Sequence, residues 1–397
     1  MSSIVQEKVK QAVGVLSELN IDAWLTFVRE TTETGDPMLP VILGQPLTWQ
    51  SALIITRAGD RIAIVGKYED EAVRSTGAFS EVIPYTKGVR DPLITTLTRL
   101  DPRQIAINYS LDDVKADGLS HGMHELLRRH LDGTDFGDRL ISAEEIIRVV
   151  RGCKTPGEIE RMRAAIATTD EIFQAAASFA KPGVTERAIS RFMHDELTKR
   201  GIEPAWEAAQ CPIVTTGPNS MVGHGLPSET LSVTPGCILH LDFGVRQDEY
   251  CSDLQRCWYV PEPGETAPPP SVQRAFDAVA DAITAAAAVM KPNSRGHEID
   301  AAARSSLLDA GYEEYQHATG HQIGRAAHDG GAVLGPKWER YGRTPDYPLQ
   351  PGQVFTLELG IENVDGKRGY LGLEEMVVVT DDGLEWLSDR QTALPLL

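Results

Sequence analysis

Two stretches of sequence decide the fold: CILHLDFGVRQDEYCSDLQRCWYV, from Cys237 to Val260, and VFTLELGIENVDGKRGYLGLEEMVVVT, from Val354 to Thr380. In each, a run of β-branched and aromatic residues leads into polar turn residues and a second such run, which predicts a two-stranded antiparallel ribbon. The runs ILHLDFG and VFTLELG are mostly apolar and do not show the even alternation of a solvated ribbon, so they read as strands that are buried on both faces. We call these segments the first and the second acidic hairpin.

The first acidic hairpin contains two aspartates. A turn at Gln247 and Asp248 is equidistant from Asp242 and Asp253, so the two aspartates are expected directly opposite each other. Opposed side chains in a ribbon lie on the same face with Cβ atoms about 5 Å apart. The predicted register therefore brings two like charges together.

The second acidic hairpin contains two glutamates in the same relation. Asp365-Gly366 is a strong turn signal, and a ribbon centred on Gly366 places Glu358 opposite Glu374. An isolated carboxylate most often faces water. Two opposed pairs within apolar strands instead favour a cation between them, because unpaired buried charge is costly and carboxylates bind hard divalent ions such as Mn²⁺, Mg²⁺ or Co²⁺.

Length and composition limit the class of protein. At 397 residues the chain predicts two domains, and 42% apolar residues are typical of a globular protein. The net charge of -19 argues against nucleic acid or an anionic membrane as a partner. Five cysteines without paired spacing favour reduced thiols and a cytoplasmic location. No signal peptide and no membrane span are expected.

Two domains are predicted, at residues 1–150 and 151–397. The first mixes strands such as DAWLTFV and QIAIN with amphipathic helices, which predicts a smaller α/β domain. The boundary is expected near Arg151, because Thr155 and Glu158 form a capping box around Pro156 and start a new helix.

The second domain contains an internal repeat. Residues 168–202 and 277–312 each read as an Ala-rich helix, a Lys-Pro turn at Lys181 or Lys291, and a second helix closed by glycine. In the sequence each helix pair precedes one acidic hairpin. The proline-rich segment Pro261–Pro270 links the two halves. We therefore predict an α+β fold with two similar halves, whose pseudo-twofold axis brings the hairpins to a shared centre.

Histidines complete the candidate site. The segment HATGHQIGRAAHDGG contains His317, His321 and His328 among small residues, and His224 has similar surroundings in NSMVGHGLP. Glycine-flanked histidines also occur in plain turns. One imidazole added to four carboxylates, however, makes a mixed oxygen and nitrogen site for two transition ions.

These residues resemble the pita-bread metallopeptidases, the family of methionine aminopeptidase, aminopeptidase P and Xaa-Pro dipeptidase (prolidase). The five metal ligands of that family match, in order and spacing, Asp242, Asp253, His321, Glu358 and Glu374. His224 and His328 match its two substrate-side histidines. The resemblance is close over residues 151–397, and residues 1–150 resemble the amino-terminal domain of the creatinase and prolidase branch.

The resemblance implies a dinuclear, metal-dependent exopeptidase that hydrolyses Xaa-Pro bonds of small peptides, with a metal-bridging hydroxide as nucleophile. It favours an Xaa-Pro dipeptidase; the alternatives are an Xaa-Pro aminopeptidase, a non-catalytic pita-bread binding protein and a metal-free creatinase-type hydrolase. Mn²⁺ is the favoured metal, with Co²⁺ and Zn²⁺ as alternatives, and homodimers are common in the family. In the implied mechanism Glu358 accepts a proton, while His224 and His328 stabilise the oxyanion and the leaving nitrogen.

The chain departs from the family pattern at three places. Leu359 follows Glu358 where the family commonly has proline, Gln255 replaces the threonine of Asp-x-Thr-Arg, and Gly372 replaces an arginine two residues before the last glutamate. The loss of that arginine predicts that the C-terminal carboxylate of a substrate is bound from elsewhere, by Arg325 or by a partner subunit. These departures concern specificity more than hydrolysis.

Overall fold

A computed structural model describes residues 3–223 and 225–397. It divides the chain into two compact units, Met1–Thr155 and Pro156–Leu397. Helix α6 (Glu144–Gly152) contains the position near Arg151 where the boundary was expected, and it packs within the first unit. Helix α7 (Pro156–Phe179) begins at Pro156, as predicted. The creatinase and prolidase character of the first unit stays a prediction.

The first unit is built on one mixed sheet with the strand order β4-β3-β2-β1-β5-β6. The predicted hairpin of β2 and β3 is present and antiparallel, whereas β4, β5 and β6 each join the sheet in parallel. Its elements are α1 (Ile4–Glu18), β1 (Ala23–Val28), α2 (Leu39–Ile42), β2 (Ser51–Thr56), β3 (Arg61–Gly66), α3 (Asp70–Ser75), β4 (Glu81–Tyr85), α4 (Arg90–Leu100), β5 (Ile105–Ile107), α5 (His121–Leu131), β6 (Leu140–Ser142) and α6.

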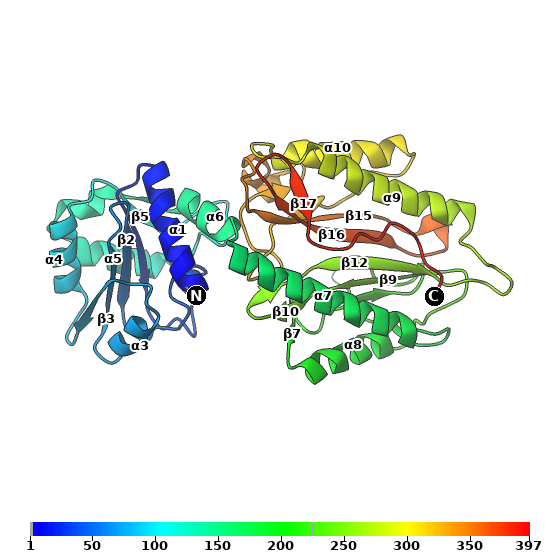
Figure 1. Ribbon diagram of the computed structural model, residues 1–397, viewed down its shortest axis with the longest axis horizontal. Coiled ribbons are helices and arrows are strands. Elements are labelled where there is room, and N and C mark those ends of the chain that lie inside the picture. The colour runs from blue at the N-terminus through cyan, green and yellow to red at the C-terminus, as the bar shows by residue number, and fades with distance from the viewer. Residues whose placement is uncertain (1–2, 224) are drawn as a thin grey trace. The chain divides into compact units, whose positions relative to one another are not determined.

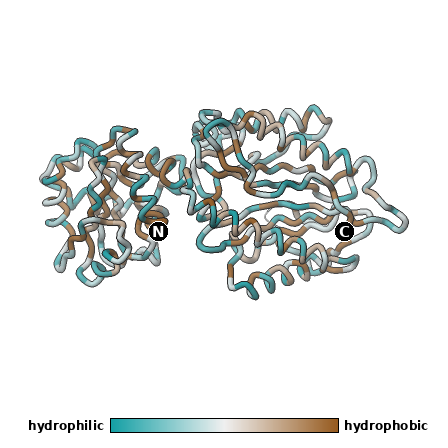
Figure 2. Tube along the Cα trace, viewed as in Figure 1, coloured by the Kyte–Doolittle hydropathy of each residue, from teal (hydrophilic) through white to brown (hydrophobic). Residues whose placement is uncertain are grey.

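This sheet has an apolar core on each face. Helices α1, α2 and α6 pack on one face around Trp24 and Leu53. Helices α4 and α5 pack on the other face around Leu25 and Ile54, so successive residues of a strand alternate between the two cores. Figure 2 shows apolar residues along these strands. The first unit is therefore an α/β sandwich, as the sequence predicts.

The second unit has a central antiparallel sheet with the order β15-β16-β12-β9-β8, to which β17 is added beside β16. A smaller sheet has the order β11-β10-β7, and β13 pairs with β14. The strands are β7 (Glu203–Pro204), β8 (Ile213–Thr215), β9 (Ile238–Phe243), β10 (Val245–Gln247), β11 (Tyr250–Cys251), β12 (Leu254–Tyr259), β13 (Gly320–His321), β14 (Val333–Leu334), β15 (Val354–Ile361), β16 (Leu371–Val379) and β17 (Leu384–Trp386).

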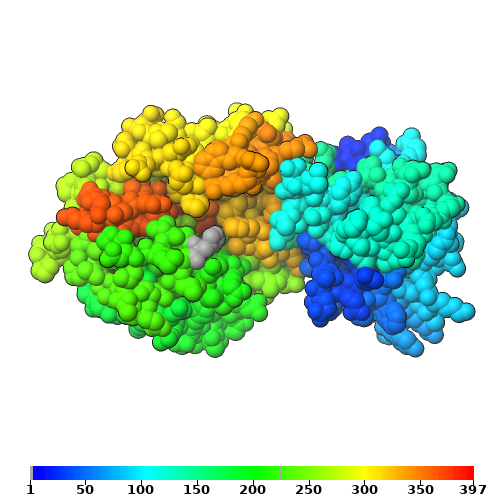
Figure 3. All heavy atoms as spheres, turned by 180° about the vertical axis from the view of Figure 1, so that it is seen from behind, coloured from blue at the N-terminus to red at the C-terminus, as the bar shows by residue number. Residues whose placement is uncertain are grey.

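Two helix pairs flank this sheet, one from each predicted half. Helices α7 and α8 (Glu186–Arg200) form the first pair, and α9 (Pro270–Val289) and α10 (Gly296–Asp309) form the second. In Figure 1 they lie on opposite sides of the central strands. The halves meet where β12 pairs with β16. In the space-filling view the first half, green, and the second half, yellow to orange, are separated by a hollow (Figure 3). The predicted duplicated α+β fold is confirmed.

The register predicted for the first acidic hairpin is wrong. Asp248 and Glu249 form its turn, both with positive φ, and Gln247 pairs with Tyr250. Moving the turn by one residue moves the pairing by two, so that Asp242 lies opposite Gln255 and not opposite Asp253. Because side chains alternate with a period of two, such a shift leaves the aspartates on the same face and makes them diagonal neighbours.

The register predicted for the second acidic hairpin is confirmed. Glu358 pairs with Glu374 in an unbroken ladder between β15 and β16. The turn lies at Asp365 and Gly366, both of which have positive φ. Among the residues that the structure describes, no helix is both long enough and apolar enough to cross a membrane.

Candidate metal centre

The candidate site begins as a row of side chains across the central sheet. Glu358 on β15 pairs with Glu374 on β16, Glu374 pairs with Gln255 on β12, and Gln255 pairs with Asp242 on β9. Directly paired residues point to the same face of a sheet, so one face presents three carboxylates and one amide side by side. The pairing of β12 with β16 thus brings the two acidic hairpins into one site.

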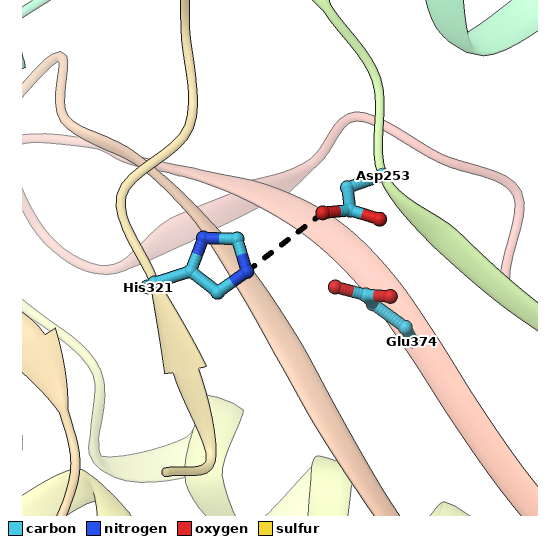
Figure 4. Close-up of side chains that lie close together, drawn as sticks. All are labelled: Asp253, His321 and Glu374. Atoms are coloured by element: carbon cyan, nitrogen blue, oxygen red, sulfur yellow. Dashed lines mark ion pairs between the residues drawn. The ribbon is translucent and has the colours of Figure 1, made fainter. Parts of the chain in front are cut away.

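Asp253 reaches the site from outside this row. It lies between β11 and β12, and its backbone N–H donates to the sulfur of Met376 at 3.4 Å. Asp253, His321 and Glu374 each offer a ligand atom, and these atoms lie within 4.8 Å of one another. Figure 4 shows the three side chains converging from separate segments of the chain.

His321 is held with one ring nitrogen facing the carboxylates. Its backbone N–H donates to the Thr356 hydroxyl at 3.1 Å, and its Nδ1 lies 3.3 Å from the carbonyl oxygen of Gln322. Its Nε2 faces Asp253 Oδ2 at 3.8 Å and Glu358 Oε1 at 3.5 Å. Burial lowers the pKa of His321 to about 3, with a further contribution from His328. The neutral ring can donate from Nδ1 and offer the Nε2 lone pair to a metal.

The four carboxyl groups of the site are crowded together and largely buried. Burial, and then the neighbouring carboxylates, raise the pKa values of Asp242, Asp253 and Glu374 well above their usual range. Burial also raises the pKa of Glu358 to about 7. Asp242 Oδ1 and Glu374 Oε1 are buried without a hydrogen-bond partner among the described residues. Buried, unpartnered oxygens beside a neutral imidazole fit the donor set of a divalent transition ion.

The other predicted histidines differ in position. The ring of His328 lies 4.4 Å from that of His321 between centroids, at an interplanar angle of 79°, and its side chain is exposed. His317 is also exposed, and its ring contacts Tyr315. The prediction for His224 lies outside the described residues. His328 is therefore next to the candidate metal centre and accessible from solvent.

Sequence reasoning missed the contribution of Gln255. Its Nε2 donates to Glu358 Oε2 at 3.0 Å and to Glu374 Oε2 at 3.2 Å. The sequence identified this position as a departure from a family pattern, but an uncharged side chain in an apolar strand carries no signal of its own. Arg256 was also missed: it is buried against Glu375 at 3.1 Å and donates to the backbone carbonyl of Glu374, which ties β12 to β16.

The arginine expected to bind a substrate carboxylate is engaged elsewhere. The side chain of Arg325 is only 7% exposed and forms an ion pair with Glu249 at 2.8 Å. It also donates to the Tyr250 hydroxyl at 3.2 Å. Arg368 donates to the carbonyl of Gly236 and forms an ion pair with Asp365. Neither guanidinium is therefore available to bind the C-terminal carboxylate of a peptide substrate.

Buried carboxylates beside an imidazole, at the centre of a duplicated α+β unit, are features of a metal-dependent protein. The sequence model of metallopeptidase family M24 matches residues 160–381, more than half of the chain. The chain therefore belongs to family M24 and is a metallopeptidase, which confirms the predicted family and enzyme class.

Relatives extend this likeness over most of the chain. An uncharacterized peptidase of Staphylococcus haemolyticus is 28% identical over 340 residues, 85% of this chain and 87% of that protein. One of Staphylococcus saprophyticus is 28% identical over 344 residues, with the same shares covered.

Solved structures match both units. An Xaa-Pro dipeptidase from Bacillus anthracis has a TM-score of 0.75 at 23% identity and covers 99% of this chain and 100% of its own. An X-Pro aminopeptidase from Thermotoga maritima has a TM-score of 0.72 at 26% identity, with 96% and 99% covered. A prolidase from Pyrococcus horikoshii has a TM-score of 0.68 at 23% identity, with 98% and 100% covered. These likenesses concern the fold.

Proposed function

We propose that this metallopeptidase is a dinuclear exopeptidase that hydrolyses Xaa-Pro bonds, with Xaa-Pro dipeptides as its main substrates. The observation that best supports the proposal is the convergence of His321 with Asp253 and Glu374, from three separate segments, at one buried place. The names of the similar solved structures, Xaa-Pro dipeptidase and prolidase among them, support the substrate class. A cytoplasmic location, favoured by the five cysteines without paired spacing, and a homodimer, as is common in the family, are part of the proposal.

In this proposal the metal ions are held by Asp242, Asp253, His321, Glu358 and Glu374. By the family resemblance, Asp253 and Glu374 would be shared, Asp242 would serve one ion, and His321 with Glu358 would serve the other; Mn²⁺ is the favoured metal, and Co²⁺ or Zn²⁺ are alternatives. When bound, such ions supply Lewis acidity and a water of lowered pKa. The unpartnered Asp242 Oδ1 and Glu374 Oε1 support the assignment.

The remaining chemistry falls to Glu358, which is itself one of the proposed ligands, and to two histidines beside the ligands. Glu358 accepts the proton of the attacking water, a role proposed from the family resemblance. His328, exposed beside His321, donates to the developing oxyanion or to the leaving nitrogen. His224 is proposed for the same task on the strength of the family resemblance. A prolyl leaving group has a tertiary amide, so the site needs no partner for an amide N–H.

The positions of Arg325 and Arg368 favour a second activity. Both guanidinium groups are bound by groups of the protein, so neither supplies the clamp that would restrict the enzyme to free dipeptides. We therefore expect that an Xaa-Pro-Xaa tripeptide is also cut. The similarity to an X-Pro aminopeptidase agrees with this second candidate activity.

The test compares kcat/KM on Ala-Pro, its C-terminal amide and Ala-Pro-Ala, after loading with Mn²⁺ and measurement of metal content. The proposal predicts two ions per chain, cleavage before proline, and values for the three substrates within about a thousandfold, or about 4 kcal/mol. A larger preference for the free dipeptide would reveal a clamp and exclude the aminopeptidase activity. A metal-loaded chain that cuts none of the three would refute the proposed function.

A further inference from the structure

Gln255 occupies the centre of the row of acidic side chains across the sheet. It pairs with Asp242 on one side and with Glu374 on the other, and Glu358 follows next. The register predicted from the sequence placed Asp253 opposite Asp242, and the structure places an amide there. The one uncharged member of the row therefore lies on the strand of the first acidic hairpin that pairs with the second.

The amide of Gln255 has a defined orientation. Its Nε2 lies 3.0 Å from Glu358 Oε2 and 3.2 Å from Glu374 Oε2, so its two N–H groups have one carboxylate each. Its Oε1 lies 2.9 Å from His240 Nε2. An ionised carboxylate accepts and does not donate, so with both glutamates ionised, as metal binding requires, the NH₂ group faces them and His240 donates to Oε1. His240 is itself buried, and its ring packs edge-on against Tyr370.

Gly372 provides the space for this arrangement. A Cβ at residue 372 would lie 2.5 Å from Gln255 Oε1 and 3.1 Å from His240 Nε2. Any side chain there would displace the amide or the imidazole. The glycine that replaces the family arginine and the glutamine that replaces its threonine are therefore two parts of one local arrangement.

The bonds from Gln255 decide which carboxylate oxygens remain available. Both bonds go to Oε2 atoms. Glu358 Oε1 is left facing His321 Nε2 at 3.5 Å, and Glu374 Oε1 is left buried and without a partner among the described residues. Each glutamate is thus held by one oxygen and presents the other to the candidate metal centre.

We propose that Gln255 is a positioning residue of the metal centre, which holds Glu358 and Glu374 together in the metal-free chain and aims one oxygen of each at the incoming metal. The inference rests on the proposed metal site. Partners of metal ligands typically contribute a factor of about 10 to 100 in metal affinity. A donor between two buried carboxylates also stabilises the protein before any metal binds.

The experiment uses the full chain with Gln255→Met, which keeps length and volume but removes the amide. Gln255→Asn is the second variant, because it keeps an amide that is one methylene too short to reach both glutamates. Gln353→Met and Gln353→Asn are matched controls: Gln353 is also fully buried in this unit, and its Nε2 has no partner among the described residues.

The readouts are Mn²⁺ affinity by chelator competition, the visible absorption of the Co²⁺-loaded protein, and Tm in EDTA. Both Gln255 variants should bind Mn²⁺ about 10 to 100 times more weakly, change the Co²⁺ spectrum, and lower the Tm in EDTA more than the controls do. Wild-type affinity and spectrum in both variants, or equal losses in the controls, would overturn the inference. A wild-type chain that binds no metal would refute the proposed function instead, while the Tm in EDTA would still test whether Gln255 holds the glutamates together.

Discussion

The two acidic hairpins contain the same kinds of residues but pair them differently. In the second, the ladder runs unbroken from Val354 to Ile361, and Glu358 directly faces Glu374. In the first, the ladder is interrupted after Phe243, where a Cβ on Gly244 would collide with the carbonyl oxygen of Ser252. The interruption leaves Asp253 outside the regular pairing, where its Oδ2 lies 3.8 Å from His321 Nε2.

The two hairpins therefore place their carboxylates in different ways. A regular hairpin presents its carboxylates in a fixed row, whereas an interrupted one re-aims a side chain toward another segment. The family resemblance implies that Asp253 is shared between ions and that Asp242, which stays in the row opposite Gln255, serves one ion.

The largest expected effect tests this difference within the first hairpin. Asp253→Asn should remove charge from both ions, lose both, and lower kcat/KM on Ala-Pro by about a thousandfold or more, because each ion stabilises the transition state by several kcal/mol. Asp242→Asn, the matched variant, should lose less metal and less activity. Metal analysis with steady-state kinetics makes the comparison. Two ions and near-normal turnover in Asp253→Asn would refute the shared role.

The next effect concerns the two neighbouring histidines of the second half. His328→Ala should lower kcat by about a hundredfold while metal content is unchanged, because His328 is expected to contact the oxyanion and no metal. His321→Ala should lose metal, since its Nε2 faces Asp253 and Glu358. Metal content and single-turnover rates separate the two outcomes. Equal metal loss in both variants would mean that these roles are assigned wrongly.

A smaller effect is expected in the pH dependence of stability. In the metal-free protein, burial raises the pKa of Asp242 and Glu374 well above the usual range and that of Glu358 to about 7. At these carboxyl groups the folded state then binds more protons than the unfolded state, so their contribution to the free energy of unfolding falls as pH rises through these folded-state pKa values. Buried His321 and His240, whose pKa values are lowered, contribute with the opposite sign, but they are two groups against four carboxyl groups, Asp253 included. Metal binding requires the deprotonated ligands and has the opposite dependence.

Thermal unfolding in EDTA should accordingly show a Tm that falls by several degrees between about pH 5.5 and pH 8, since 1 kcal/mol corresponds to about 2–4 °C in a protein unit of this size. The gap in Tm between Mn²⁺-loaded and EDTA-treated protein should widen over the same range. Glu358→Gln should reduce the slope in EDTA, because it removes one titrating group. A Tm in EDTA that rises with pH would contradict the expected proton uptake.

Local patterns were enough to predict most of the fold. The hairpins, the helix pairs and the break at the Pro261–Pro270 segment follow from apolar periodicity and turn residues, which act over a few residues. Glu358 and Glu374 could be paired because Asp365-Gly366 is a turn whose residues readily adopt positive φ. Here local preference and tertiary structure agree.

The first hairpin could not be placed in the same way, because distant groups contribute to its turn. Glu249 pairs with Arg325, and Arg161 donates to the backbone carbonyl of Asp248. Asp248 and Glu249 both have positive φ, which is uncommon for residues other than glycine, and the local sequence does not predict it. The error in register also hid Gln255, because Asp253 had been placed opposite Asp242.

The smallest expected effect tests that register directly. Asp248 has φ +48° and Gln247 lies in β10, where its side chain accepts a hydrogen bond from the Thr168 hydroxyl at 2.7 Å. Glycine tolerates positive φ but weakens a strand by about 0.5–1 kcal/mol. Asp248→Gly should therefore change stability by less than about 0.5 kcal/mol, whereas Gln247→Gly should destabilise by about 1 kcal/mol or slightly more once the lost hydrogen bond is included. A turn at Gln247 and Asp248, as the sequence alone suggested, would instead make Gln247→Gly neutral or stabilising. Urea unfolding of the two variants under identical metal conditions distinguishes the registers, because only the register of the structure predicts that Gln247→Gly is destabilising.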